Sequence, residues 1–566
     1  MATTEAATLR PAAAGVVDAP RRTSRARAGV AALSAFCAVV VGARLGGVAS
    51  PLLRGGAPTN LGGIAPGASK LDYTLTYSDF LEFEGVRAFL KSQGVDKDDW
   101  STFDDLEKYV PREVTFEVAH DKVEGAIGVG ALEGYVFTSL VYHYDGAFTA
   151  SYLVVVDYYG KLVQVSPTYG ETMIDKGYTA SKGVEDMVYQ VLGLKMFNNT
   201  HVLLSLGESG GTSGPRALWH WRADAYVTLC GGKTNDAHDI QWAYEEAAVW
   251  QVDGTTKVEE ASAATGRILD HFAEVRVQDP NHLQATEEDT KFYISSRQTN
   301  AIIKMNADGA VEWTLGGEYG DYKIEDYDGT IYRAGEVVWS GQHNAEYFGD
   351  DEFCMFDNQE ETSNLYAQSR LLCVKLVDDG DSKKGVVTFS YFMGAYTPHF
   401  GDNDRLPTGN QLGVHWPYYV ETDDEYDVRA VEVERDSGDL AWEMKVLGPK
   451  CDAAKRCDHA EVGWYAYSIE RVYGVPLLWD LECSDATLSF KTVNNFKQMN
   501  EFKGYYSVAA AVTGDDDAAS VDGHFDFAAH WRETAVDVDV PAKTSRVQLT
   551  VTNQFGDETA AHVDCR

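Results

Sequence analysis

Basic residues are scarce in this 566-residue chain: 48 Lys and Arg stand against 87 Asp and Glu, which gives a formal net charge of −39. Arginines outnumber acidic residues only in the first 60 residues, so the remainder is more acidic still. A surface with this charge repels nucleic-acid phosphates and anionic lipid headgroups. We therefore exclude nucleic acid as a partner, and an anionic substrate would need a local basic site.

The chain also lacks the motifs of common cofactor sites. No CxxC pair occurs among its cysteines, which argues against zinc. The GGKT run at 231–234 has Val227 where a phosphate-binding loop needs its first glycine, which argues against a nucleotide-dependent transferase. The GxSxG run at 207–211 is followed by a turn and strand pattern, whereas a hydrolase nucleophile elbow needs a helix there. We predict neither a metal nor a cofactor.

The spacing of the cysteines predicts disulfide bonds instead. Three pairs are suitably placed: Cys354 with Cys373, Cys451 with Cys457, and Cys483 with Cys565. Cys37 lies in the apolar N-terminal run, so Cys230 is the odd one of the remaining seven. Disulfide bonds would indicate an oxidising compartment.

An N-terminal apolar run agrees with that compartment. Four arginines between residues 21 and 27 precede the apolar residues 28–43, and Val48-Ala49-Ser50 offers a small-residue cleavage site. The pattern predicts a signal anchor or a cleaved signal peptide, with a plastid transit segment as the third interpretation. We predict a single-pass type II membrane protein of the secretory pathway, with its bulk in the ER or Golgi lumen, or a secreted protein if the segment is cleaved. Membrane contact would be limited to this segment, and the Asn198-Asn199-Thr200 sequon predicts a glycoprotein.

A turn pattern of hydrophobic strand, polar residues, glycine and hydrophobic strand recurs through the middle of the chain. Its glycines are Gly160, Gly214, Gly266, Gly309, Gly385 and Gly438. A tight hairpin favours glycine at a positive φ, and the flanking residues alternate as half-buried strands do. Six units, each long enough for four short strands, predict a six-bladed β-propeller; an ordinary β-sandwich is the alternative.

The rest of the chain divides into three parts. Residues 1–60 are the predicted cytoplasmic tail with its signal anchor or signal peptide, and residues 61–144 form a mixed region with helical patterns. Residues 479–566 alternate in short runs, which is typical of a small β-sandwich. We thus predict an all-β fold: a propeller over 145–478, a C-terminal β-sandwich and a short, partly helical N-terminal region.

Four histidines lie at a similar phase before the turn glycines of consecutive units: His238, His282, His343 and His415. Because residues at one phase of successive blades converge on a propeller's channel, we expect these imidazoles to meet there. Arg297 and Arg370 follow strand-like runs and are candidates for the same channel. The alternatives are ordinary histidines at blade entrances and solvated surface arginines.

The order of several motifs resembles the arylsulfotransferase family. The matching runs are HDI (238–240), PNHL (280–283), YISSRQTNAIIKM (293–305), DGAVEWTLGG (308–317), GQHNA (341–345), FCMFDN (353–358), LPTGN (406–410) and SIERVYGVP (468–476). The resemblance covers roughly residues 235–478. It implies a six-bladed propeller that moves a sulfuryl group from an aryl sulfate to a phenol or other hydroxyl acceptor, through a sulfated histidine and without a nucleotide donor.

The resemblance also implies roles for particular residues. It assigns catalysis to His343, His282, His415 and Arg370, and substrate binding to His238, Arg297 and Asn358. His343 and His415 are both candidates for the nucleophile. A neutral imidazole can attack sulfur, while guanidinium groups bind the nonbridging oxygens in a bidentate manner. A non-catalytic propeller that binds glycans or proteins, and a sulfate ester hydrolase, are the competing functions.

Overall fold

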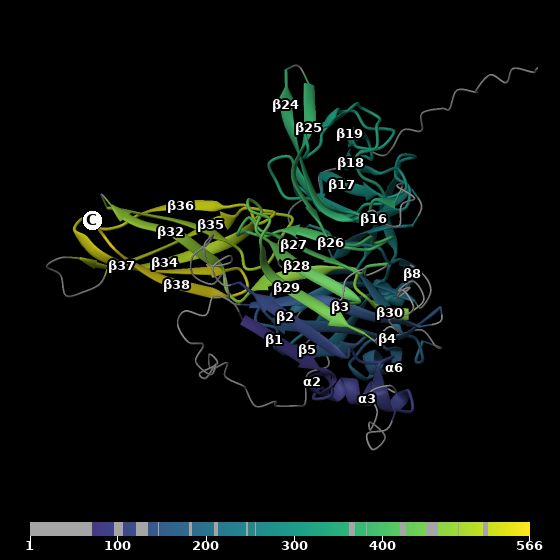
Figure 1. Cartoon of the computed structure of the whole chain (residues 1–566). Coiled ribbons are helices and arrows are strands. Elements are labelled where there is room, and N and C mark those ends of the chain that lie inside the picture. The colour runs from purple at the N-terminus through teal and green to yellow at the C-terminus, as the bar shows by residue number, and fades with distance from the viewer. Residues whose placement is uncertain are drawn as a thin grey trace, which may run out of the picture. The chain divides into compact units, whose positions relative to one another are not determined.

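The computed structural model describes 14 segments of the chain that together cover most of residues 71–566. They are 71–95, 106–119, 134–144, 146–179, 184–208, 213–244, 247–254, 256–360, 368–380, 382–418, 426–448, 462–484, 486–512 and 519–566. Strands predominate in them and pair almost wholly antiparallel, which confirms the predicted all-β class (Figure 1).

Three antiparallel sheets form the first half of the described chain. The first sheet joins β3 (Gly134–Tyr144), β4 (Ala147–Asp157) and β5 (Leu162–Pro167) with β30 (Val462–Tyr465) and β31 (Ile469–Tyr473). The second contains β6 (Tyr189–Met196), β7 (His201–Glu208), β9 (Arg216–His220) and β10 (Ala225–Leu229), and beside it the short strands β8 (Ser213–Gly214) and β11 (Asn235–Asp236) pair with each other. The third contains β12 (Ile240–Trp242), β13 (Ala248–Val252), β14 (Lys257–Ser262) and β15 (Ile268–Ala273).

Three more sheets follow along the chain. The fourth contains β16 (Pro280–Thr286), β17 (Lys291–Ser296), β18 (Ala301–Asn306) and β19 (Val311–Leu315). The fifth contains β22 (His343–Tyr347), β23 (Glu352–Asp357), β24 (Arg370–Asp379) and β25 (Ser382–Phe392), extended by β20 (Ile324–Glu325) and β21 (Ile331–Tyr332). The sixth contains β26 (Asp402–Arg405), β27 (Gln411–His415), β28 (Val428–Val433) and β29 (Leu440–Leu447), extended by β2 (Glu113–Val118) and β1 (Leu71–Thr76).

The C-terminal part contains two further sheets. One joins β32 (Leu477–Ser484), β33 (Thr487–Val493) and β36 (Thr534–Asp539); the other joins β34 (Phe502–Val512), β35 (Ala519–Phe527), β37 (Thr544–Asn553) and β38 (Glu558–Asp564). They share a hydrophobic core that includes Leu488, Val508 and Leu549. Helices are short: α2 (Tyr77–Phe80), α3 (Glu84–Ser92), α6 (Gly170–Asp175) and the 3₁₀ turn η2 (Cys230–Gly232).

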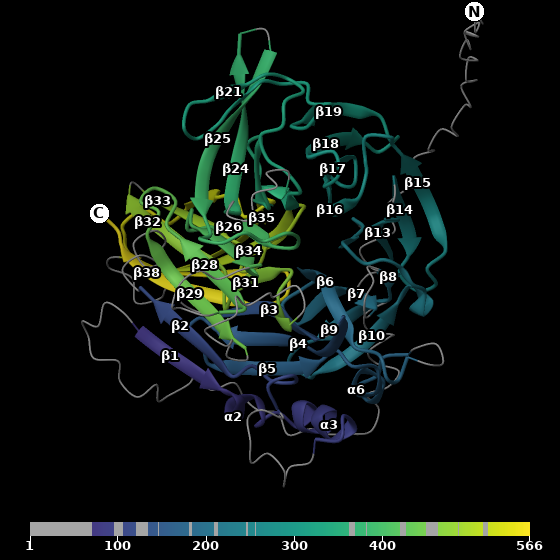
Figure 2. The same ribbon diagram turned by 45° about the vertical axis from the view of Figure 1, so that its right-hand side comes forward.

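The six sheets contact one another in chain order, and the last returns to the first. β6 contacts β3 and β4, β7 contacts β12, β12 contacts β16, β16 contacts β22, and β22 contacts β26. β27 then contacts β31, which pairs with β3 of the first sheet (Figure 2). The first sheet is thus assembled from strands more than 300 residues apart in the sequence.

Two glutamines join neighbouring sheets through the peptide backbone. Gln241 on β12 donates from Nε2 to the carbonyl of Ala285 on β16 at 2.5 Å and accepts from its N–H at 2.9 Å. Gln284 on β16 binds the backbone of Tyr347 on β22 in the same way, at 2.9 and 2.6 Å. β12, β16 and β22 belong to different sheets and do not pair with one another by a backbone ladder. The two side-chain amides therefore satisfy buried backbone N–H and C=O groups that would otherwise lack partners.

The sheets are buried on both faces where they pack on each other. Successive side chains of a strand point to opposite faces, so Phe292 on β17 packs on Trp250 of the third sheet while Tyr293 packs on Phe353 of the fifth. The ring centroids lie 4.7 and 5.2 Å apart, respectively. Such edge-to-face aromatic contacts stabilise the core beyond the burial of their area.

Two of the predicted disulfides are present. Cys354 and Cys373 lie directly opposite each other on β23 and β24, and Cys483 is bonded to Cys565. Cys230 is a buried free thiol, as expected for the odd cysteine. The predicted Cys451–Cys457 pair lies outside the described residues.

The predicted turn glycines fall into two groups. Gly160, Gly266, Gly309 and Gly438 adopt positive φ values of 91°, 60°, 81° and 75°, as the hairpin pattern predicts. Gly214 and Gly385 instead lie within β8 and β25, where they are ordinary strand residues. The helical pattern upstream corresponds to α2 and α3, but the same region also supplies β1 and β2 to the sixth sheet.

The prediction of a single-pass type II membrane protein is contradicted. Among the residues that the structure describes, no helix has the length and apolarity needed to cross a bilayer. The apolar run at 28–43, on which that prediction depended, lies outside the described residues. The Asn198 glycosylation motif stays a prediction; its side-chain oxygen accepts hydrogen bonds from the N–H groups of Thr200 and His201.

Replacing Gln241 by alanine is expected to destabilise the protein by about 2 kcal/mol, because it leaves both backbone groups of Ala285 buried and unpaired. Urea unfolding measures the change. The control is Gln548→Ala on β37, whose side chain is exposed and whose loss should stay within about 0.5 kcal/mol. Equal effects of the two substitutions would show that the Gln241 contacts contribute nothing.

Candidate functional site

His343 begins β22 and is held by two acceptors on the same ring nitrogen. Its side chain is buried, and Nδ1 lies 3.0 Å from the carbonyl of Gly341 and 2.8 Å from Oδ1 of Asn358. The amide of Asn358 is oriented in turn, because its Nδ2 donates to the carbonyls of Thr397 and Phe400, both at 3.0 Å. The oxygen of Asn358 must therefore face the imidazole.

This arrangement determines the tautomer of His343. Both partners of Nδ1 are acceptors, so Nδ1 carries the proton and Nε2 carries the lone pair. Burial lowers the pKa of His343 well below its usual value, and the positive charge of Arg297 lowers it further. Nε2 makes no hydrogen bond to any described residue and is not among the fully enclosed atoms. The ring thus offers a neutral, unshared nitrogen.

Three other groups share the electrostatic environment of His343: Arg297, His238 and His399. His238 donates from Nδ1 to Asp236 at 2.8 Å, so in the neutral form of the ring Nε2 carries the lone pair. Burial, followed by the charge of Arg297, lowers the pKa of His399 to about 4. The structure therefore brings together His238, Arg297, His343 and Asn358 of the predicted set and adds His399.

Arg297 is the cation of this cluster, but it is not free. Its guanidinium pairs with Asp279 at 2.9 Å and Glu360 at 2.7 Å, and about a quarter of its side chain is exposed. Its Nε is enclosed and has no hydrogen-bond partner. The two carboxylates orient the guanidinium, and together they more than balance its single positive charge.

The loop between β25 and β26 connects the cluster to the sixth sheet. Phe400 has a φ of 69°, a conformation that a bulky side chain rarely adopts. Its ring centroid lies 4.4 Å from His399, 4.9 Å from Tyr467 and 6.3 Å from His343. The loop thus holds an aromatic ring against two imidazoles while its carbonyl binds Asn358.

His282 lies on β16 in a separate polar network. Its Nδ1 is 3.3 Å from Oδ2 of Asp239, which also accepts from Lys195 at 2.8 Å. Burial, followed by the charge of Lys195, lowers the pKa of His282 to about 4. Its Nε2 is enclosed without a partner.

His415 and Arg370 are enclosed by their own partners. Nδ1 of His415 lies 3.1 Å from the hydroxyl of Thr397, and its Nε2 is sealed from solvent without a partner. Arg370 is bound by Asp357 at 2.8 Å and Asp326 at 3.3 Å, and it donates to the carbonyl of Val338. Neither is among the groups that act on the pKa of His343.

Sequence reasoning missed His399, Tyr467, Lys195 and Asp239. Tyr467 directly precedes the SIERVYGVP run and packs on His343 with a centroid distance of 5.9 Å. Asp239 is the middle residue of the HDI run, so its place beside His238 could have been noticed. Nothing in the sequence marks His399 or Lys195. No cluster able to hold a metal ion occurs among the described residues.

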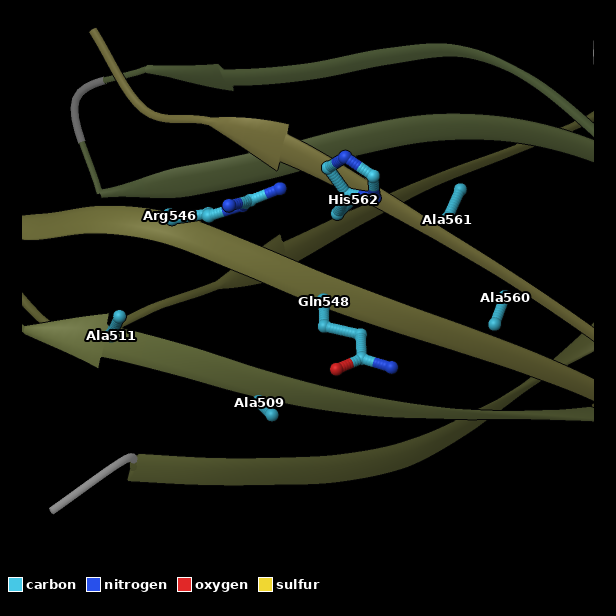
Figure 3. Close-up of a pocket in the computed structure, with 7 residues that line it drawn as sticks. All are labelled: Ala509, Ala511, Arg546, Gln548, Ala560, Ala561 and His562. Atoms are coloured by element: carbon cyan, nitrogen blue, oxygen red, sulfur yellow. The ribbon is translucent and has the colours of Figure 1, made fainter.

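An open pocket lies far from this chemistry, on the outer face of a C-terminal sheet. Side chains of β34, β37 and β38 line it: Ala509, Ala511, Arg546, Gln548, Ala560, Ala561 and His562 (Figure 3). Four of these residues are alanines, and Arg546 and His562 lie near each other. None of the predicted site residues is part of it.

Residues 279–448 match the family described as arylsulfotransferase (ASST), which confirms the resemblance seen in the motifs. No curated protein matches the chain. Similar solved structures include a putative 6-phosphogluconolactonase from Bacteroides uniformis, with 13% identity, 68% of this chain and 99% of that chain covered, and a TM-score of 0.34. Another is the WD40 β-propeller domain of Doa1, with 12% identity, 59% and 97% covered, and a TM-score of 0.31. At these scores the structural likenesses carry no argument.

Replacing Asn358 by aspartate is expected to raise the pKa of His343, because a carboxylate would then face Nδ1 and stabilise the imidazolium. Titration of the His343 ¹⁵N resonances by NMR measures the shift. Asn410→Asp, which alters a buried amide bound to Glu432 instead, is the control. An unchanged His343 titration in Asn358→Asp would contradict the assigned hydrogen bond.

Proposed function

We propose that the chain transfers a sulfuryl group from an aryl sulfate to a phenol or other hydroxyl acceptor, and the match of residues 279–448 to the arylsulfotransferase family supports this proposal. The observation that carries the proposal is the pair of acceptors on Nδ1 of His343, which leaves Nε2 neutral and nucleophilic. The same match favours reading the six sheets as blades of a propeller and the two C-terminal sheets as a sandwich.

In the first step Nε2 of His343 attacks sulfur and forms an N–S bond. The S–O bond to the aryl group breaks, and the aryl oxide leaves with the electron pair. Nδ1 keeps its proton, which Gly341 and Asn358 stabilise as the ring becomes positively charged. A sulfuryl group on such a ring is activated for a second transfer.

In the second step the acceptor oxygen attacks sulfur and the electrons of the N–S bond return to Nε2. The acceptor proton must leave, and Nε2 of His238 is the base we assign to it. Asp236 binds the opposite ring nitrogen of His238 and stabilises the imidazolium that forms. The same proton then protonates the departing aryl oxide in the next cycle.

Arg297 is assigned to the nonbridging sulfuryl oxygens. It is the cation whose charge acts on both His343 and His399. Apart from the nucleophile, sulfuryl transfer needs little covalent participation by the protein. Orientation of the reactants and electrostatic stabilisation therefore supply most of the rate acceleration. His282, His415 and Arg370 are assigned to supporting roles, since their polar atoms are enclosed or occupied.

Incubation with 4-nitrophenyl sulfate, with and without phenol, tests the proposal. We expect release of 4-nitrophenol to depend on phenol, and His343→Ala to reduce it by at least about 10³-fold because the nucleophile is lost. His271→Ala, which alters an exposed histidine on β15, is the matched control. A sulfuryl mass increment on the peptide that contains His343 would identify the intermediate.

The competing functions give different outcomes in the same assay. Release without phenol that appears as inorganic sulfate would identify a sulfate ester hydrolase. No release from any aryl sulfate by the folded protein would favour a binding propeller. Full activity in His343→Ala would disprove the assigned nucleophile.

A further inference from the structure

A lysine from the C-terminal part of the chain is buried among carboxylates of three different sheets. Lys497 lies in the loop between β33 and β34, and only 5% of its side chain is exposed. Its Nζ lies 2.6 Å from Glu346 on β22, 2.7 Å from Asp404 on β26 and 3.7 Å from Glu470 on β31. These strands belong to the fifth, sixth and first sheets.

A second C-terminal loop docks beside it on the fourth sheet. His530, between β35 and β36, lies 3.0 Å from the hydroxyl of Thr286 and 3.2 Å from the amide of Gln284. Thr286 also donates to the carbonyl of Met499, two residues after Lys497. The C-terminal sheets therefore contact four of the six sheets where their inner strands meet.

The carboxylates around Lys497 cannot all be ionised without a cation. Burial would raise the pKa of Glu346, but Lys497, together with His282 and Lys195, lowers it to about 2. Burial raises the pKa of Glu470 to about 8 and that of Asp402 to about 6, although Lys497 opposes both shifts. Lys497 is thus the main counter-charge of a buried acidic group.

This cluster is connected to the candidate site through β22. Glu346 stands three residues after His343 on that strand, and its charge also acts on His282. Oε1 of Glu346 and Nε2 of His282 are both enclosed without partners. Loss of the Lys497 ion pair would leave Glu346 buried and uncompensated, which is relieved either by protonation of the carboxylate or by movement of the strand.

We propose that Lys497 is a positioning residue of the site: the C-terminal sheets supply the cation that fixes Glu346, and with it the strand that carries His343. This role of Lys497 rests on the proposed function only in the activity measurement; the unfolding and NMR measurements do not depend on it. The charged and titratable groups that face Lys497 or its partners are Glu346, Asp402, Asp404, Glu470, Lys195, His282, His530, Arg405 and Arg532.

The test compares Lys497→Met, Lys497→Arg and Lys503→Met in the full chain. Lys503 lies in β34 six residues later and forms an exposed ion pair with Asp526, so it controls for loss of one lysine. Unfolding in urea is measured between pH 5.5 and 8.5. In the wild type, acids with raised pKa values keep their protons only in the folded state, so stability falls as the pH rises through about 6 and 8.

Lys497→Met should steepen that fall, because the carboxylates then need protons in place of the cation. We expect a small loss of the urea midpoint at pH 5.5 and a much larger one at pH 8.5, while Lys503→Met follows the wild type. Lys497→Arg should restore most of the midpoint, since it retains the charge. Identical pH dependence of Lys497→Met and wild type would overturn the proposal.

Two readouts separate positioning from general stability. The His282 ring should titrate at a higher pH in Lys497→Met, because the charge of Lys497 lowers the pKa of His282 in the wild type. Sulfuryl transfer should fall more at pH 8.5 than at pH 5.5. A steeper unfolding profile with an unchanged His282 titration would reduce Lys497 to a stabilising residue and contradict the proposal.

The role of Lys497 can still be tested if Lys497→Met does not fold or if the wild type shows no transferase activity. If Lys497→Met does not fold, Glu470→Gln replaces it; it should flatten the wild-type stability profile near pH 8, and an unaltered profile would count against the proposal. If the wild type transfers sulfuryl groups from no aryl sulfate, the proposed function fails alone. The unfolding and NMR titrations still decide the role of Lys497.

Discussion

The pairing of β3 with β30 and β31 is the contact on which the rest of the molecule depends. It joins the beginning and the end of the six-sheet series, so inner strands that would otherwise be free edges contact a neighbour on each side. Within the series, Gln241 and Gln284 take over the role of a backbone ladder between sheets. Because this pairing closes the series, side chains from segments far apart in the sequence, including those of the candidate site, lie close together.

An acidic protein would need a local arrangement of charges to bind the anionic substrate that we propose, and the candidate site has one. Carboxylates near the cluster are engaged, Asp236 by His238 and Asp279 by Arg297. His343, the proposed nucleophile, is kept neutral by burial and by the direction of two hydrogen bonds. In the mechanism we propose, charge develops on the ring only when sulfur is bound, and Gly341 and Asn358 would stabilise it there.

Sequence patterns predicted what is local and periodic. Strand alternation gave the all-β class, cysteine spacing gave two of the disulfides, and motif order led to His343 and Asn358. The membrane prediction failed against the described residues. The sequence alone could not predict the places of His399 and Lys497. His399 lies in a loop without a motif, and the ion-pair partners of Lys497 are at least 27 positions away in the sequence. Their roles arise from tertiary contacts that no single segment encodes.

The backbone of Phe400, in the loop between β25 and β26, is strained. A side chain in the left-handed region stores roughly 1–3 kcal/mol that a glycine would not. Its contacts with His399 and Tyr467 offset that energy, while its carbonyl orients Asn358. If the loop relaxed to an unstrained conformation, Asn358 would lose the carbonyl of Phe400 that orients its amide. His343 could then adopt the other tautomer, and the contact between Thr397 and His415 would weaken at the same time.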